Sequence, residues 1–337
     1  MTGAGRLEGA DPEGKLAPKG MGRIEIGADA LSLHLDAVSE LAREPRDAPP
    51  HVVLAMDSTP MRRGGEVLKA PERLFGGYVF DLDGTVYLGD DLLPEAKETL
   101  GELKARSNVV YLTNKPLEMP ADYAAKLTRL GVRTPPEEVI SSTDALVLYL
   151  ERHAPKARLF VVGERPLRQL LSSAGYDVVQ GPEGVEVVVV SFDRTFDYRK
   201  LQAAFDAVRG GARIVATNPD AYCPTPEGGG LPDCAAMLAA IEASTGARAE
   251  AIVGKPSAHM AAALLDRLGV PARDTLLVGD RLATDVRMAN EAGMISALVL
   301  TGATGPEEAL ASTDRPDYVI YHLGELLGVP VTGERDL

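Results

Sequence analysis

The chain from Tyr78 onward alternates short, β-branched apolar runs with amphipathic stretches of helical spacing. Apolar runs of about five residues bounded by glycine or polar residues predict buried strands, and apolar residues three to four apart predict helices. We predict strands at 77–81, 108–114, 275–280 and 296–302. We predict helices between them at 94–106, 120–131, 257–269 and 284–293. This alternation is typical of an α/β protein with a parallel sheet covered on both faces.

A second set of strands and helices interrupts the first. Its predicted strands are 157–164, 185–193 and 212–220. Its predicted helices are 166–174, 198–209 and 233–245. We therefore predict an inserted domain over 147–249, within a discontinuous core formed by 76–146 and 250–337.

Residues 1–75 do not share this pattern. They are rich in glycine and proline, and only 30–43 has helical apolar spacing, so we expect a poorly ordered extension. Two explanations stay open. The start of the chain is assigned too early, since Met21, Met56 and Met61 also precede the globular pattern, or the extension is a regulatory or partner-binding arm.

Composition and charge narrow the functional classes. Apolar residues make up 45% and charged residues 25% of the 337 residues, which is ordinary for a globular protein. The net charge of −14 argues against binding to nucleic acid or to an anionic membrane. Since there is neither an apolar run of membrane-spanning length nor a signal-peptide pattern, we expect a cytoplasmic protein. We expect Cys223 and Cys234 to be reduced thiols.

Polar residues follow four of the apolar runs. Asp81 follows YVF, Thr113 and Asn114 follow VVYL, Lys255 follows AIVG, and Asp280 follows LLVG. Taken singly, such residues are ordinary turn or cap residues, or solvated charges. Ligands of an open parallel sheet bind outside the carboxyl ends of its strands, so these residues together indicate a functional site.

Carboxylates gather at these strand ends. Asp83 lies two residues after Asp81, and Asp285 five residues after Asp280. Two like charges about 4 Å apart repel by roughly 4 kcal/mol at an effective dielectric constant near 20. A hard cation such as Mg²⁺ prefers oxygen ligands and offsets this repulsion. We therefore predict a metal site formed by Asp81, Asp83 and Asp280.

These residues suit phosphoryl transfer. Asp81 can attack phosphorus to form an aspartyl-phosphate, and Asp83 can protonate the leaving oxygen and then deprotonate water. Thr113 and Asn114 can hydrogen-bond the phosphoryl oxygens, and Lys255 can neutralise their charge. We also expect Gly84, where the chain turns, to lie at the phosphate.

The motifs DLDGT, LTN, GKP and GDRLATD follow one another in the order of the haloacid dehalogenase superfamily. The long gap between LTN and GKP, the TNPD stretch and GDRLATD resemble the NagD-type and 4-nitrophenyl phosphatases, which form subgroup IIA. The resemblance covers 77 to about 326. It implies a Rossmann-like core with an inserted α/β cap of the C2 type, and caps of this type often form homodimers in relatives.

The resemblance also implies roles for residues. Asp81 is then the nucleophile, Asp83 the acid and base, and Mg²⁺ is held by Asp81, the Asp83 main-chain carbonyl and Asp280. Asp285 then orients Lys255 or a metal-bound water. An aspartate at the second position of the first motif also favours phosphatases over dehalogenases.

Two departures concern the substrate. Lys115 stands where many relatives carry a second asparagine, which adds a cation beside the phosphate. LPDCAAM replaces a glycine-containing pattern at the start of a helix. TNKP and PDCAAM resemble the arabinose-operon type of sugar phosphatase. We expect the cap loop 218–224 to overhang the pocket. Three of its residues have either structural or substrate-contact roles: Asp220, Tyr222 and Cys223.

We therefore expect a Mg²⁺-dependent phosphatase with broad specificity for small phosphorylated metabolites such as sugar phosphates. The alternatives are a non-catalytic sensor of phosphorylated metabolites and a phosphatase of the same family specific for phosphoglycolate or glycerol phosphate. Asp83 argues against a pure sensor, which needs no acid-base group. A nucleotide-binding dehydrogenase is disfavoured because no GxGxxG follows the first predicted strand.

Overall fold

The computed structural model describes residues 62–63, 66–67, 70–116, 118–224 and 229–328. Most of the predicted N-terminal extension, including its helix at 30–43, lies outside the described residues. Its described residues include a short antiparallel pair, β1 (Arg62–Arg63) and β2 (Glu66–Val67).

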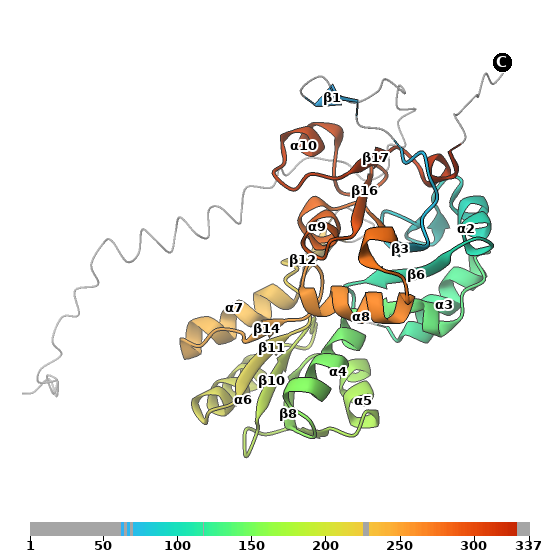
Figure 1. Ribbon diagram of the computed structural model, residues 1–337. Coiled ribbons are helices and arrows are strands. Elements are labelled where there is room, and N and C mark those ends of the chain that lie inside the picture. Colours follow the sequence, from blue (N-terminus) through green and yellow to red (C-terminus); the bar gives the residue numbers. More distant parts are fainter. Residues whose placement is uncertain (1–61, 64–65, 68–69, 117, 225–228, 329–337) are drawn as a thin grey trace, which may run out of the picture. The chain divides into compact units, whose positions relative to one another are not determined.

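A six-stranded parallel sheet forms the core and has the order β17-β16-β15-β3-β6-β7 (Figure 1). Its strands are β3 (Gly77–Asp81), β6 (Asn108–Thr113), β7 (Val139–Ser141), β15 (Thr275–Gly279), β16 (Ile295–Val299) and β17 (Tyr318–Ile320). Every residue of β3 and β15 is buried, as expected for strands covered on both faces. The predicted α/β class is confirmed.

The order of the strands creates a switch point at the centre of this sheet. From β3 the chain continues to β6 and β7 on one side, and after the second sheet it returns to β15 on the other side of β3. Helices that leave neighbouring strands in opposite directions open a crevice at their carboxyl ends. The residues after β3 and β15 therefore lie side by side at this crevice.

A second parallel sheet, which we call the cap sheet, has the order β14-β11-β10-β8-β9 (Figure 1). Its strands are β8 (Arg158–Val162), β9 (Asp177–Val179), β10 (Val187–Val190), β11 (Arg213–Ala216) and β14 (Ala251–Ile252). All of them come between β7 and β15 in the sequence. The boundaries 147 and 249 stay predictions.

Helices flank both sheets, in the places where the sequence predicts them and in some where it does not. The α-helices are α2 (Ala96–Lys104), α3 (Pro120–Arg129), α4 (Ser142–His153), α5 (Arg165–Ser173), α6 (Tyr198–Arg209), α7 (Cys234–Thr245), α8 (Ala258–Leu268), α9 (Arg287–Glu291) and α10 (Pro306–Ala311). Shorter elements are the 3-10 helices η1 (Pro136–Glu138), η2 (Ala272–Asp274) and η4 (Leu323–Leu327), the π-helix η3 (Leu282–Val286), and the hairpins β4–β5 (Tyr87–Leu88 with Asp91–Leu92) and β12–β13 (Tyr222–Pro224 with Gly230–Pro232).

One apolar cluster joins the two sheets. It contains Val79 and Leu112 of the core sheet and Val189 of the cap sheet, and between them Leu146 of α4 and Leu264 of α8. Helices α4 and α8 pack against each other and belong to the two segments that connect the sheets (Figure 1). The two sheets therefore share part of their hydrophobic packing rather than having wholly separate cores.

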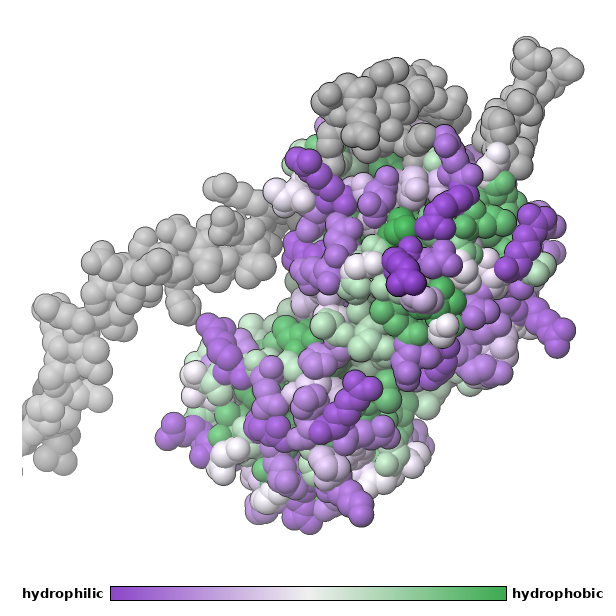
Figure 2. All heavy atoms as spheres, viewed as in Figure 1, coloured by the Kyte–Doolittle hydropathy of each residue, from purple (hydrophilic) through white to green (hydrophobic). Residues whose placement is uncertain are grey.

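The face in Figure 2 is mostly hydrophilic over the described residues, with apolar residues in small scattered areas. None of the described helices is long and apolar enough to cross a membrane. Cys223 and Cys234 are thiols, as expected from the sequence.

Replacing Leu112 by alanine should destabilise the protein. Leu112 is fully buried in the shared cluster, and a truncated core leucine loses about 2–5 kcal/mol through lost burial and the cavity left behind. We expect the urea midpoint to fall clearly. The matched control is Leu88→Ala on β4, because this leucine is 45% exposed and should change stability by less than about 0.5 kcal/mol. Equal midpoints for the two variants would contradict the packing described here.

Candidate active site

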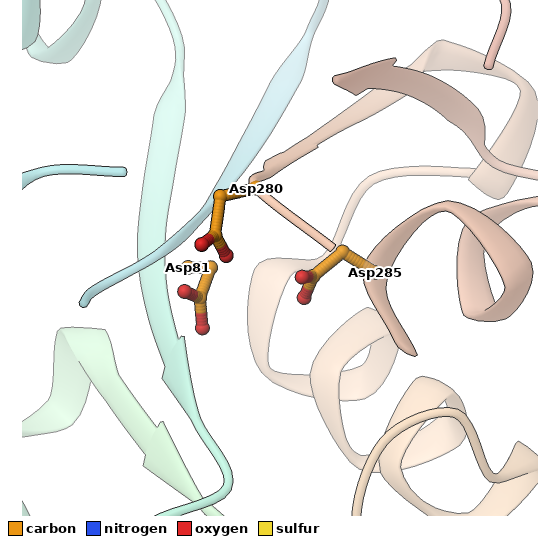
Figure 3. Close-up of side chains that lie close together, drawn as sticks. All are labelled: Asp81, Asp280 and Asp285. Carbon is orange, nitrogen blue, oxygen red and sulfur yellow. The ribbon is translucent and has the colours of Figure 1, made fainter. Parts of the chain in front are cut away.

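Asp81 and Asp280 face each other at the switch point. Asp81 is the last residue of β3, and Asp280 directly follows β15, the neighbouring strand. Their carboxylates are close together in Figure 3, and both residues are buried. The sequence pattern alone predicted this juxtaposition, because each residue follows an apolar run that becomes a central strand.

Asp285 completes a cluster of three carboxylates. It lies in the π-helix η3 and points toward Asp81 and Asp280 (Figure 3). Oxygen atoms of these three residues lie within 4.8 Å of one another. A Cβ added to Gly279 would lie only 2.4 Å from the Asp285 Cβ, so the chain after β15 passes this side chain closely. The Asp285 carboxylate also accepts hydrogen bonds from the Arg281 main-chain N–H and the Thr284 hydroxyl, both at 3.3 Å.

Lys255 provides the positive charge at this cluster. Its buried ammonium forms ion pairs with Asp81 and, at 2.7 Å, with Asp285. The sequence correctly placed Lys255 after an apolar strand, but that strand, β14, pairs with β11 of the cap sheet. Lys255 therefore reaches the carboxyl end of β3 from the segment that returns from the cap sheet to the core.

The cluster has more negative than positive groups, with three carboxylates around the Lys255 ammonium. Burial raises the pKa of Asp81, and so do the charges of Asp285 and Asp280. The Lys255 charge acts to lower this pKa, but the overall shift is upward. Burial and the Asp285 charge likewise raise the pKa of Asp280. Burial alone acts to lower the pKa of Lys255, but Asp285 and Asp81 raise it overall. One ammonium thus compensates three carboxylates only in part.

Asp280 has an oxygen that fits a cation. Its Oδ2 accepts a hydrogen bond of 2.7 Å from the Ala303 N–H, while its Oδ1 is buried and has no hydrogen-bond partner among the described residues. The chain wraps closely around this carboxylate, since a Cβ at Gly84 or Gly302 would lie 2.6 or 2.1 Å from Oδ2. Gly84 also has φ of +82°, which favours glycine. A buried oxygen-only cluster with an unpaired oxygen fits a hard cation such as Mg²⁺.

Asp83 lies beside the cluster rather than in it. Between the two aspartates, Leu82 is fully buried in the core, so Asp81 and Asp83 both point away from that core. The Asp83 side chain is 35% exposed, and its Oδ2 forms an ion pair of 3.0 Å with the Lys115 ammonium. Burial acts to lower the pKa of Lys115, but Asp83 raises it overall. Lys115 is thus held next to the predicted acid-base residue.

Thr113 and Asn114 follow at the end of β6, the strand next to β3. Thr113 is buried, and its hydroxyl accepts a hydrogen bond of 3.1 Å from the Lys115 N–H. Asn114 is also buried, and it contacts Asp220 of the cap loop through a hydrogen bond of 3.1 Å from Nδ2 to the Asp220 carboxylate. The predicted contacts of Thr113 and Asn114 with a phosphoryl group stay predictions.

The other predicted cap residues lie on strand β12. Tyr222 is 49% exposed, and Cys223 is half-buried. Burial raises the pKa of the Cys223 thiol, while the Lys115 charge acts to lower it. Cys223 is thus close enough to Lys115 to respond to its charge. Asp220, near the start of the same loop, contacts Asn114 at the carboxyl end of the core sheet. The roles of these three residues stay predictions.

Two further charged residues, one after β15 and one at the cap loop, were not predicted from the sequence. Burial acts to lower the pKa of Arg281, but the charges of Asp280, Asp220 and Asp81 raise it overall. Burial raises the pKa of Asp233 to about 6, and its carboxylate accepts a hydrogen bond from the Cys234 N–H at the start of α7. Both residues lie in motifs that the sequence already marks, Arg281 in GDRLATD and Asp233 in LPDC.

Comparisons with known proteins agree with this geometry. Residues 78–177 match the haloacid dehalogenase-like hydrolase family model, and 252–326 match the HAD-hydrolase-like model. The chain is 36% identical to the sugar-phosphatase AraL of Bacillus subtilis, over 72% of this chain and 89% of that protein. It is 33% identical to a dihydroxyacetone phosphatase of Corynebacterium glutamicum, over 74% and 90% of the two chains.

Solved structures show the same architecture. The 4-nitrophenylphosphatase of Thermotoga maritima has 37% sequence identity and a TM-score of 0.71, over 76% of this chain and 97% of that one. A glycerol phosphate phosphatase of Mycobacterium tuberculosis, in complex with magnesium, has 32% identity and a TM-score of 0.70, over 77% and 78%. The predicted Rossmann-like core with an inserted cap is thereby confirmed. The chain belongs to the haloacid dehalogenase-like hydrolases, within the NagD-like subgroup IIA.

Proposed function

We propose that this protein is a Mg²⁺-dependent phosphatase that hydrolyses small phosphate monoesters, sugar phosphates among them, through an aspartyl-phosphate on Asp81. That it is a phosphoric monoester hydrolase follows from its family and from its phosphatase relatives. The observation that carries the finer proposal is the buried group of Asp81, Asp280, Asp285 and Lys255 at the switch point.

The first half-reaction breaks the ester bond. A carboxylate oxygen of Asp81 attacks phosphorus, the bond between phosphorus and the ester oxygen breaks, and Asp83 gives a proton to the leaving oxygen. Lys255 lies next to the attacking carboxylate, where its charge stabilises the phosphoryl oxygens in the transition state. Thr113 lies at the end of the adjacent strand, and in this proposal its hydroxyl donates a hydrogen bond to one of these oxygens.

The second half-reaction releases phosphate. Asp83 now takes a proton from water, the water oxygen attacks phosphorus, and the bond from phosphorus to Asp81 breaks. The residues that would hold Mg²⁺ are Asp81, Asp280 and the Asp83 main-chain carbonyl, with Asp285 orienting Lys255. When bound, the ion supplies positive charge that offsets the carboxylates and the phosphoryl oxygens.

Several observations support the choice of substrate class. The related proteins carry names that refer to sugar phosphates, dihydroxyacetone phosphate and glycerol phosphate. Lys115 pairs with Asp83, and the charge of Arg281 acts on Asp280 and Asp81, so both add positive charge near the proposed site of a chain whose net charge is −14. A panel of phosphorylated metabolites assayed by phosphate release would rank the substrates, with phosphoglycolate and glycerol phosphate included. A cytoplasmic location and a homodimer formed through the cap stay predictions.

Replacing Asp81 by asparagine should abolish turnover. The amide has nearly the same shape but is a much weaker nucleophile, so kcat for 4-nitrophenyl phosphate should fall by about 10³-fold or more. The matched control is Asp90→Asn, an exposed aspartate of the same segment, which should retain wild-type activity. An Asp81→Asn enzyme within tenfold of the wild type would contradict the proposed nucleophile.

Removal of divalent cations should also stop the reaction. We expect EDTA to abolish phosphate release and excess Mg²⁺ to restore it, because the carboxylate cluster is otherwise only partly compensated. A second readout is thermal stability. An ion that binds only the native state, at a concentration of 100 times its Kd, adds about 2.7 kcal/mol to the free energy of unfolding. Mg²⁺ should raise Tm of the wild type and raise it much less in Asp280→Asn. Full turnover in EDTA would rule out the metal.

Replacing Lys115 by methionine tests its pairing with Asp83. Without this partner Asp83 is held less well for proton transfer, so esters with a poor leaving group should suffer most. We expect kcat for an alkyl phosphate to fall by about 10- to 100-fold, and kcat for 4-nitrophenyl phosphate, whose phenolate leaves without a proton, to fall less. The control is Lys126→Met, whose partner Asp90 is exposed. Equal losses for both esters would argue against this role.

A further inference from the structure

Asn114 lies where four segments of the chain meet. It follows β6 in the core sheet, and its hydrogen-bond partners come from three other segments. Ser142 begins the connection from the core to the cap sheet, Asn218 and Asp220 belong to the cap loop after β11, and Lys255 belongs to the returning connection. Asn114 therefore contacts both connections between the sheets as well as the cap loop.

The side-chain amide of Asn114 is bound by protein atoms on both its oxygen and its nitrogen. Its Oδ1 accepts a hydrogen bond of 2.7 Å from the Lys255 N–H. Its Nδ2 donates to the Asp220 carboxylate at 3.1 Å and to the Lys255 carbonyl at 3.2 Å. Since the amide nitrogen carries two hydrogens, both are used. The orientation of the amide is fixed by its partners, because a flipped amide would place N–H groups against the Lys255 N–H.

The main chain of Asn114 is held in the same way. Its carbonyl accepts hydrogen bonds from the Ser142 hydroxyl at 2.8 Å and from the Asn218 amide at 3.4 Å, and both partners are fully buried. Asn218 in turn accepts a hydrogen bond of 3.0 Å from the Asp220 N–H. The cap loop is thus bound to Asn114 at two points, one on the side chain and one on the main chain.

Gly254 shows how closely the returning connection approaches Asn114. A Cβ at this position would lie 2.7 Å from the Asn114 Oδ1 and 2.4 Å from the Thr217 carbonyl oxygen. Both distances are shorter than real Cβ contacts, so a larger residue would push the connection away from Asn114. The next residue is Lys255, whose ammonium reaches Asp81 and Asp285.

We propose that Asn114 is a positioning residue that couples the seating of the cap loop to the placement of Lys255. This inference rests on the proposed function. With Asp220 in place, the Asn114 amide is fixed and clamps both the N–H and the carbonyl of Lys255. When the cap loop moves away, Nδ2 loses its carboxylate acceptor, and the clamp on Lys255 loosens. Asp220 then acts through Asn114 and Lys255 rather than by contact with the substrate.

This proposal differs in its consequences from a direct contact of Asn114 with the phosphoryl group and of Asp220 with the leaving group. In the direct case the two residues act independently, and the effect of Asp220 depends on the substrate. In the coupled case both residues serve one clamp. Their losses then overlap, and they are the same for every leaving group, because Lys255 acts on the phosphoryl side.

The experiment is a double-mutant cycle with Asn114→Ala and Asp220→Ala. We expect each single variant to lower kcat by about 10- to 100-fold, by the same factor for 4-nitrophenyl phosphate and for glucose 6-phosphate, with little change in KM. The kcat of the double variant should be no lower than the kcat of the less active of the two single variants. The control is Asp177→Ala, a cap aspartate in an exposed ion pair, which should leave kcat unchanged. Tm of each variant is measured to confirm that it is folded.

An exchange of the two side chains tests the hydrogen bond itself. N114D should lose activity because it places a carboxylate against both Asp220 and the Lys255 carbonyl. Adding D220N should restore part of this loss, because the hydrogen bond between residues 114 and 220 can re-form in reverse while the bond to the Lys255 carbonyl cannot. Independent losses in the cycle, or a substrate-dependent loss at Asp220, would overturn the coupling. A wild-type enzyme without turnover would instead overturn the proposed function.

Discussion

The burial of three carboxylates around one ammonium is the constraint on which the rest of the site depends. Taking a charged group out of water costs several kcal/mol unless a partner and hydrogen bonds compensate it. Lys255 pairs with Asp81 and Asp285, and main-chain N–H groups serve Asp280 and Asp285, yet Asp280 Oδ1 stays without a partner among the described residues. This excess of negative charge and the unpaired oxygen fit a further cation, and the glycine turns at Gly84 and Gly302 pass close to the Asp280 carboxylate.

This group of charges cannot be assembled by one sheet alone. The core sheet places Asp81 and Asp280 on neighbouring strands, but Lys255 arrives from the segment after β14 of the cap sheet. The shared apolar cluster along α4 and α8 holds the two sheets together on the side where the connections run. Hydrophobic packing therefore fixes the connecting segments, and the cap loop with Asp220 is attached to the core mainly by hydrogen bonds.

The sequence predicted the central strands and the site residues that follow them. Strands β3 and β15 are fully buried, and β6 is buried after its first residue, so each contains an apolar run, which is the strongest local signal available. The short edge strands β7, β9 and β17 were missed, because three residues carry too little pattern. Helix α4 was missed since it is apolar on several sides. The helix expected at 284–293 begins as a π-helix at Leu282, where Asp285 turns into the cluster.

Contacts between distant segments were beyond the reach of pattern analysis. The sequence placed Asn114 and Lys255 after strands but assigned the strand before Lys255 to the core, whereas β14 pairs with β11 of the cap sheet. The link from Asn114 to Lys255 and Asp220 could therefore not be foreseen. Likewise, Lys115 was expected beside the phosphate, and its pairing with Asp83 became visible only in three dimensions. Such contacts depend on how the cap loop and the connections return to the core, and local propensity does not encode this.

The pairing of the lysines also bears on how an anionic substrate can bind. The ammonium groups of Lys255 and Lys115 already have carboxylate partners, so they do not form an unpaired positive surface. An incoming phosphate must therefore share these ammonium groups with Asp81, Asp83 and Asp285, and its own charge is opposed by the same carboxylates. A cation at Asp280 would offset the carboxylates, and a fixed Lys255 beside Asp81 would offset the charge of the phosphoryl oxygens. The proposed clamp around Lys255 and the proposed cation would thus serve the same electrostatic purpose.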